Sequence, residues 1–223
     1  NSMGIQPDFL IARAERPLDK KRKERLALFC NLDGDDIISN PDVESVYDVA
    51  LSFDEQAFAD RILKRWRLKP KQKDLSDWVN LAQTVKAVNQ EITIAMVGKY
   101  FATGDYVLSD VYISVIESLK YAGWQNGVKI KMRWVDSEKI EADGPGKYLQ
   151  GVAGVIVPGG FGSRGIEGII QAIQFARENN IPYFGLCYGM QLATVEIARH
   201  IAGLTDANST EINLETKHAV IHI

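Results

Sequence analysis

Cys187 stands in the segment Gly185-Leu186-Cys187-Tyr188-Gly189, after an apolar run at 181–184 and before a helical pattern at 189–201. A nucleophile at a sharp strand-to-helix turn is the layout called a nucleophile elbow. Glycines on both sides permit the strained turn, and the N-terminus of the following helix favours a thiolate. The backbone N–H of Tyr188 would face a developing oxyanion. The pattern therefore predicts nucleophilic catalysis by Cys187, and a buried structural cysteine is the weaker alternative.

A glycine-dense segment, 158–165, follows the apolar run 155–157. From Gly160 to Gly165 it fits G-x-G-x-x-G, so a dinucleotide-binding module is an alternative interpretation. That fingerprint expects an acidic residue about twenty positions later to hold a ribose, and this sequence has Gly185-Leu186-Cys187 there. We therefore favour a loop in which the N–H of Gly160 supplies the second oxyanion donor. A tight turn without a ligand remains open for Gly162 and Gly165.

Strand and helix patterns alternate in the part of the chain that carries these two segments. The expected strands cover 92–97, 128–135, 155–157 and 183–186, and the expected helices cover 109–122, 166–177 and 189–201. Such alternation predicts an α/β fold with a mostly parallel sheet and helices on both faces. Catalytic groups then belong at the carboxyl ends of the strands, where both glycine-rich segments fall.

The earlier part of the chain is organised differently. A strand is expected at 9–12, a helix from the basic run at Lys20 to Cys30, and another helix capped by Asp54 with apolar positions 58, 62 and 66. A polar, proline-interrupted stretch at 69–74 and a helix at 75–90 suit an interdomain linker. We expect a domain at 1–68, a linker at 69–90 and a second domain at 91–223.

The composition limits the classes of partner and the cellular compartment that we expect for this protein. A net charge of -3 and a pI near 5.7 give no general attraction to nucleic acid or to an anionic membrane. The sequence has no run of about twenty apolar residues and no N-terminal signal pattern, so we expect a cytoplasmic protein. Its two cysteines do not make a disulfide framework, and Cys30 is interpreted as a small buried hydrophobe.

Several ordered motifs resemble the CTP synthase family over nearly the whole chain. Segments 158–168 and 185–191, with Ala207-Asn208-Ser209-Thr210-Glu211, resemble its class I glutamine amidotransferase domain. Segments 4–8, 16–17 and 27–31 resemble the end of its ATP-dependent amidoligase domain, and 96–100 resembles the first glutaminase strand. Two departures stand out. Tyr188 replaces a common aliphatic residue, and 101–108 lengthens the loop after the first strand.

The resemblance implies roles for particular residues. Cys187 would form a glutamyl thioester, with Gly160 and Tyr188 as the oxyanion hole. Glutamine would be held by Phe161, Gln191 and Glu211, and the lid loop linked to GTP would contain Arg164 and Glu167. Adenine would be held by Arg16, Asp42 and Val43, with Arg25 near nucleotide phosphates. Taken singly, the three glutamine-binding residues have structural alternatives: Phe161 as a packed aromatic, Gln191 as a helix-surface amide and Glu211 as a loop carboxylate.

The resemblance also implies the reaction. In the amidoligase domain, ATP with Mg²⁺ would activate UTP, and ammonia from glutamine would convert it to CTP. GTP would stimulate the glutaminase step. The family's assembly is a homotetramer. The glutaminase site itself needs no cofactor or metal. The family's phosphate-binding loop would precede residue 1, and its catalytic His and Glu would follow residue 223, because His200, His218 and His222 lack the family's context for a base. A non-catalytic assembly piece is the remaining alternative.

Overall fold

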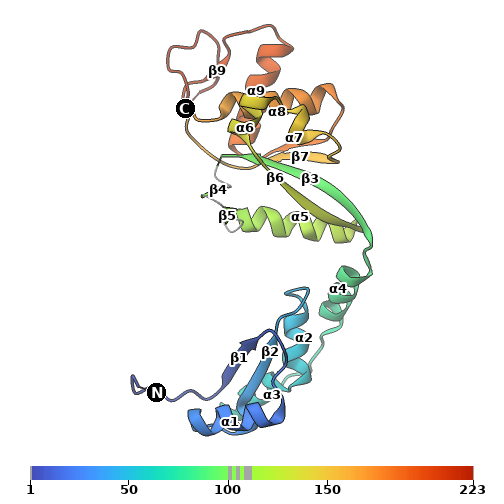
Figure 1. The fold of residues 1–223 in the computed structure, drawn as a ribbon, viewed down its shortest axis with the longest axis vertical. Coiled ribbons are helices and arrows are strands. Elements are labelled where there is room, and N and C mark those ends of the chain that lie inside the picture. The colour runs from blue at the N-terminus through green and yellow to red at the C-terminus, as the bar shows by residue number, and fades with distance from the viewer. Residues whose placement is uncertain (1, 100–101, 104–105, 108–111, 223) are drawn as a thin grey trace. The chain divides into compact units, whose positions relative to one another are not determined.

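The computed structural model describes residues 2–99, 102–103, 106–107 and 112–222. The chain forms two compact units, Asn1–Ala87 and Val88–Ile223 (Figure 1). Half of the long loop expected at 101–108 and the start of the helix expected at 109–122 lie outside the described residues.

The first unit is built on a parallel strand pair joined by a helix. Strands β1 (Leu10–Ala14) and β2 (Ile37–Pro41) pair in register, with Leu10 opposite Ile37. Helix α1 (Lys20–Cys30) connects them, and the Asp19 side chain caps its N-terminus by accepting from the Arg22 N–H. The remaining elements are the 3₁₀ turn η1 (Gly34–Asp36) and helices α2 (Asp48–Glu55), α3 (Phe58–Arg65) and α4 (Ser76–Ala87).

The expected helix capped by Asp54 is wrong in this unit. Asp54 lies inside α2, and a new helix, α3, begins after Ala57, whose φ of 52° lies in the left-handed region. One of the predicted apolar positions does pack in the unit, because the ring of Phe58 contacts the rings of Phe9 and Phe53 edge-on. Trp66 ends α3 with 65% of its surface exposed, so it does not pack the helix onto the unit.

The second unit contains a four-stranded parallel sheet in the order β6-β3-β7-β8. Its strands are β3 (Gln90–Gly98), β6 (Val128–Asp136), β7 (Gly154–Val157) and β8 (Tyr183–Gly185). The register aligns Gly98 with Asp136, and Val157 with Gly185. The carboxyl ends of neighbouring strands thus meet at one edge, where ligands bind in open parallel sheets.

Helices cover both faces of this sheet, unequally (Figure 1). Alternate residues of β3 point to opposite faces, as strand geometry requires. Ala95 and Val97 join the larger core beneath α6 (Ser137–Asp143), α8 (Ile166–Glu178) and α9 (Tyr188–His200). Met96 faces the smaller cluster under α5 (Ile113–Gln125).

The α/β fold with a parallel sheet is confirmed, and each expected strand and helix of this unit is present within a few residues of its expected ends. Within the described residues of this unit, six short elements had not been expected. They are α6, α7 (Gly146–Leu149), the two-residue pair β4 (Ala102–Thr103) and β5 (Tyr106–Val107), and the parallel pair of β9 (Asn208–Ser209) with β10 (Ala219–Ile221), together with their connecting turns. Short segments carry too little periodicity to be recognised.

Candidate active site

Cys187 occupies a strained turn between β8 and α9. Its φ of 51° and ψ of −103° are unusual for a residue with a side chain, and it stands at the N-cap position of α9. The residue is exposed, and its carbonyl accepts from the Gln191 N–H at 3.1 Å as the helix begins. An exposed thiol at a helix N-terminus is placed to act as a nucleophile.

The two glycines beside the cysteine are required by close backbone contacts. A Cβ on Gly185 would lie 2.5 Å from the carbonyl carbon of Gly189. A Cβ on Gly189 would lie 2.3 Å from the carbonyl oxygen of Val157, at the end of β7. Real Cβ atoms do not approach backbone atoms so closely. Glycine therefore lets α9 start directly against the strand ends, as expected for a nucleophile elbow.

The glycine-rich loop after β7 lies beside this turn. A Cβ on Gly159 would be 3.8 Å from the Cβ of Cys187, and a Cβ on Gly160 would be 3.6 Å from Cδ1 of Tyr188. The loop that was expected to supply the second oxyanion donor thus runs along the cysteine and the residue after it. This placement supports a shared oxyanion hole.

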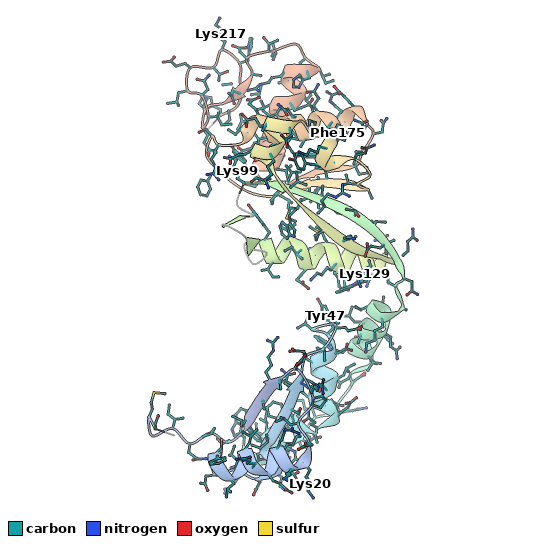
Figure 2. The ribbon with its side chains drawn as sticks, in the orientation of Figure 1. Lys20, Tyr47, Lys99, Lys129, Phe175 and Lys217 are labelled. Atoms are coloured by element: carbon teal, nitrogen blue, oxygen red, sulfur yellow. The ribbon has the colours of Figure 1, made fainter. Side chains whose placement is uncertain are left out.

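Side chains from distant parts of the chain hold this loop. Tyr112 donates its hydroxyl to the carbonyl of Gly159 at 3.2 Å, and Tyr188 donates to the carbonyl of Gly162 at 2.5 Å. Lys99, labelled in Figure 2, donates to the carbonyls of Phe161 and Gly162 at 3.2 and 2.6 Å. These contacts connect the loop to the end of β3 and to the start of α9.

Lys99 is an uncommon buried cation, with 7% of its surface exposed. Its Nζ lies 4.7 Å from the centroid of the Tyr188 ring, a cation–π arrangement. Burial lowers the pKa of Lys99, the carboxylate of Glu211 opposes that shift, and Arg164 adds to it. Backbone carbonyls supply hydrogen bonds that partly offset the cost of burying the ammonium.

The three residues expected to hold glutamine lie around the same edge. Phe161 lies on the loop, and 69% of its surface is exposed. Glu211 accepts from the Gly162 N–H at 3.4 Å, so the segment after β9 reaches the loop. Gln191 lies on the first turn of α9, and its buried side-chain oxygen has no hydrogen-bond partner among the described residues. An orphaned buried oxygen beside a nucleophile suits a polar substrate.

Arg164 and Glu167, expected in the lid loop, are both held by ion pairs. Arg164 pairs with Glu138 of α6 at 2.6 Å, and Glu167 pairs with Arg199 of α9 at 3.0 Å. The four side chains lie at least partly at the surface, where such pairs contribute about 0–1 kcal/mol each. The first pair sets the position of the loop against α6. Glu167 itself lies in the first turn of α8 rather than in the loop, so the second pair joins α8 to α9.

The nucleotide-binding candidates belong to the first unit. Arg16 follows the end of β1, and Asp42 and Val43 follow the end of β2, so the parallel pairing brings these three exposed residues to one edge. Asp42 accepts from the Arg13 side chain at 3.3 Å and donates its N–H to Ala14. Arg25 is exposed on α1, apart from that edge in sequence and element.

The described part of the chain has neither a membrane-spanning helix nor a cluster of metal ligands. No described helix is long and apolar enough to cross a membrane. Within residues 2–99, 102–103, 106–107 and 112–222, no three His, Cys, Asp or Glu side chains are grouped so as to hold a metal ion.

Sequence reasoning missed the residues that hold the loop. The motif at 96–100 indicates a strand that includes Lys99, and the elbow motif predicts a role for the backbone N–H of Tyr188, but neither motif predicts a side-chain contact with the loop. The bonds from Lys99 to the loop span 62 and 63 residues, and its contact with Tyr188 spans 89. A lysine at the end of an apolar strand was the one available signal, because such a residue must find partners if it is buried.

Comparisons with known proteins place the chain in a family. The family model "Glutamine amidotransferase class-I" matches residues 107–222, and "CTP synthase N-terminus" matches residues 1–68. The CTP synthases of Acaryochloris marina and Ruminiclostridium cellulolyticum are each 47% identical over 222 residues. These alignments cover 100% of this chain but 39% and 40% of the relatives, so the chain spans about two fifths of their length.

Among the solved structures that are similar to this chain is the glutaminase domain of Trypanosoma brucei CTPS with bound acivicin. It is 42% identical, with a TM-score of 0.54, and the match covers 59% of this chain and 50% of that one. The resemblance seen in the motifs is thereby confirmed along the whole chain. With its elbow cysteine, its parallel sheet and a family model matching more than half of its residues, the chain belongs to the class I glutamine amidotransferase family.

Proposed function

We propose that Cys187 releases ammonia from glutamine, and that the protein uses this ammonia to aminate UTP to CTP as a CTP synthase. The observation that carries the first step is the strained, exposed Cys187 at the N-terminus of α9, beside a glycine loop. Similarity to CTP synthases at both ends of the chain supports the second step.

The glutaminase step follows from this geometry. The Cys187 thiolate attacks the carboxamide carbon of glutamine, and the carbonyl oxygen gains negative charge facing the N–H groups of Tyr188 and Gly160. The C–N bond then breaks, the nitrogen takes up a proton and leaves as ammonia, and a glutamyl thioester remains. Water hydrolyses the thioester to glutamate and frees the thiol.

Substrate recognition is assigned to the side chains around the cysteine. The orphaned oxygen of Gln191 can accept a hydrogen bond from the glutamine's polar groups, and Glu211 can pair with its ammonium. The exposed ring of Phe161 can cover the aliphatic stem. Arg164 and Glu167, through their ion pairs, are assigned to the loop that responds to GTP.

His200 does not suit the base that this chemistry needs. It ends α9, twelve residues beyond Tyr188, which places it about 18 Å along the helix axis. Its Nδ1 also lies 3.2 Å from the fully buried carboxylate of Glu196. His200 is therefore assigned a structural pairing with Glu196.

The first unit is proposed to belong to the amidoligase half. We assign residues 1–68 to the end of that domain, 69–90 to the linker and 91–223 to the amidotransferase domain. Arg16, Asp42 and Val43 would hold the adenine of ATP, and Arg25 would face nucleotide phosphates. Mg²⁺ would accompany ATP, and the described residues offer no cluster of ligands for it. A cytoplasmic homotetramer is part of the same proposal.

A dinucleotide-binding module is less well supported. The loop does precede α8, as that fold requires. However, β8 ends at Gly185 and leads into the cysteine turn, where an acidic residue would be needed to hold a ribose.

The test is Cys187→Ser in the whole protein that carries this chain. Glutamine-dependent CTP formation should be lost, whereas formation from added ammonia should persist, because the thiol acts only in releasing ammonia. As a control, a chloroketone analogue of glutamine should label Cys187 and spare Cys30, which is partly buried at the end of α1. Equal loss of both activities, or equal labelling of the two thiols, would contradict the proposal.

A further inference from the structure

Tyr188 has a second set of contacts besides its backbone N–H. Its side chain is 2% exposed, and its hydroxyl donates to the carbonyl of Gly162 at 2.5 Å. Its ring edge faces the backbone of Gly160, since a Cβ there would lie 3.6 Å from Cδ1 of the ring. One residue therefore begins the helix behind the cysteine and also contacts the glycine loop at two points.

Lys99 completes this contact from the end of β3. Its Nζ lies 2.6 Å from the same Gly162 carbonyl and 3.5 Å from the Tyr188 hydroxyl. The other side of Gly162 is held as well, because its N–H donates to Glu211 at 3.4 Å. With a φ of +79°, Gly162 has a conformation that other residues rarely adopt, and both of its backbone polar groups have partners.

We propose that the Tyr188 side chain, supported by Lys99, is a positioning clamp that fixes the Gly160 N–H relative to the Tyr188 N–H. The inference rests on the proposed glutaminase function and adds a role for a side chain that an aliphatic residue in the same place could not perform. An oxyanion hole works only when both donors are held at the position where the charge develops. Here one donor belongs to Tyr188 itself, and the hydroxyl of the same residue holds the loop that carries the other.

The clamp differs from general core packing. Burial alone would place a tyrosine ring under the loop, but it would not require a hydroxyl aimed at a carbonyl that also receives a buried ammonium. Two donors on one carbonyl use both of its lone pairs. Removing the hydroxyl leaves Lys99 in place, so the loop should loosen without unfolding.

Tyr188→Phe tests the proposal, with Lys99→Met as a second variant that keeps the aliphatic stem. The matched control is Tyr183→Phe, which removes another partly buried hydroxyl, bonded at 2.7 Å to the carbonyl of Gly189 rather than to the loop. Hydrogen exchange of peptides covering 158–165, measured by mass spectrometry, should become about tenfold faster in both test variants and stay unchanged in the control.

A chemical measurement joins the clamp to the oxyanion hole. The chloroketone analogue of glutamine places a carbonyl oxygen in the hole, and its label forms when a C–S bond replaces the C–Cl bond and chloride leaves. Iodoacetamide alkylates the thiol by direct displacement and needs no oxyanion donor. Tyr188→Phe should slow chloroketone labelling of Cys187 about five- to tenfold and leave iodoacetamide labelling unchanged, a smaller loss than removing a donor outright.

The outcomes separate the clamp from the proposed function. Unchanged exchange in Tyr188→Phe would overturn the clamp, and faster exchange with unchanged chloroketone labelling would overturn its link to the oxyanion hole. If the unsubstituted protein takes up no chloroketone at Cys187, the proposed function fails, and the exchange rates still decide whether Tyr188 holds the loop.

Discussion

The loop after β7 and the elbow after β8 meet beside Cys187, but they are held in place by different means. At the elbow, the backbone itself fills the space, since a Cβ on Gly185 or Gly189 would overlap main-chain atoms. In the loop, Gly159 and Gly160 have room for a Cβ, and side chains hold the carbonyls instead. The elbow is thus fixed by steric exclusion, and the loop by hydrogen bonds that can be removed one at a time.

The glycines of the elbow and those of the loop therefore have different roles. Those of the elbow are needed for the fold, because no other residue fits there. Gly159 lies next to the nucleophile with space around it, so its missing side chain leaves room for a ligand near the thiol. Substitutions should therefore separate loss of stability at the elbow from loss of reactivity at the loop.

Gly189→Ala should have the largest effect. The added methyl would lie 2.3 Å from the carbonyl oxygen of Val157, and neither backbone segment can move without displacing β7 or α9. We expect a loss of about 3 kcal/mol or more in the free energy of unfolding, measured by urea titration with circular dichroism. Alanine favours helices more than glycine does, so propensity cannot explain a loss.

The control is Gly146→Ala at the start of α7. Its methyl would meet only Cε2 of Phe175, at an ordinary 3.9 Å, and stability should change by less than about 1 kcal/mol. Similar stabilities for the Gly189 and Gly146 variants would contradict the claim that the elbow is fixed by steric exclusion, because the elbow would then tolerate a side chain.

Gly159→Ala should give the opposite result, a folded protein with a hindered site. The methyl would lie 3.8 Å from the Cβ of Cys187, which is ordinary contact. Stability should therefore remain within about 1 kcal/mol, while chloroketone labelling falls about tenfold because the reacting carbon is held away from the sulfur. An equal fall in iodoacetamide labelling would mean that the methyl only shields the thiol, and marked unfolding would remove the distinction between loop and elbow.

The same difference explains what could be predicted from the sequence. The elbow was predictable because its requirements are local, a strand, a helix and two glycines within a few residues. The parallel sheet was predictable for a similar reason, since each strand is an apolar run with clear ends. The placement of the loop depends on Lys99 and Tyr112, which are far from it in sequence, and no spacing rule joins them.

The wrong prediction at Asp54 has a related cause. The residue type suits an N-cap, and the apolar positions after it have helical spacing. In the structure the chain breaks instead at Ala57, and Asp54 belongs to the preceding helix, where its carboxylate pairs with Lys73. Local pattern could not tell a helix start from a break between two helices.

The smallest expected effect concerns strain at Cys187. With φ at 51° and ψ at −103°, a residue with a Cβ is held in a sparsely populated conformation, at a cost of about 1–3 kcal/mol. Glycine adopts such angles freely, although it loses more chain entropy on folding, about 0.5–1 kcal/mol. The free energy of unfolding of Cys187→Gly, measured by urea titration, should therefore exceed that of Cys187→Ala by about 1 kcal/mol, even though neither variant has a thiol.

The control is an ordinary helical position, where glycine is less favourable than alanine. Ala198→Gly in α9 should therefore be less stable than the unsubstituted protein. A Cys187→Gly variant less stable than Cys187→Ala would mean that the elbow stores no strain, and that contacts made by the side chain, rather than the backbone turn, hold the nucleophile in place.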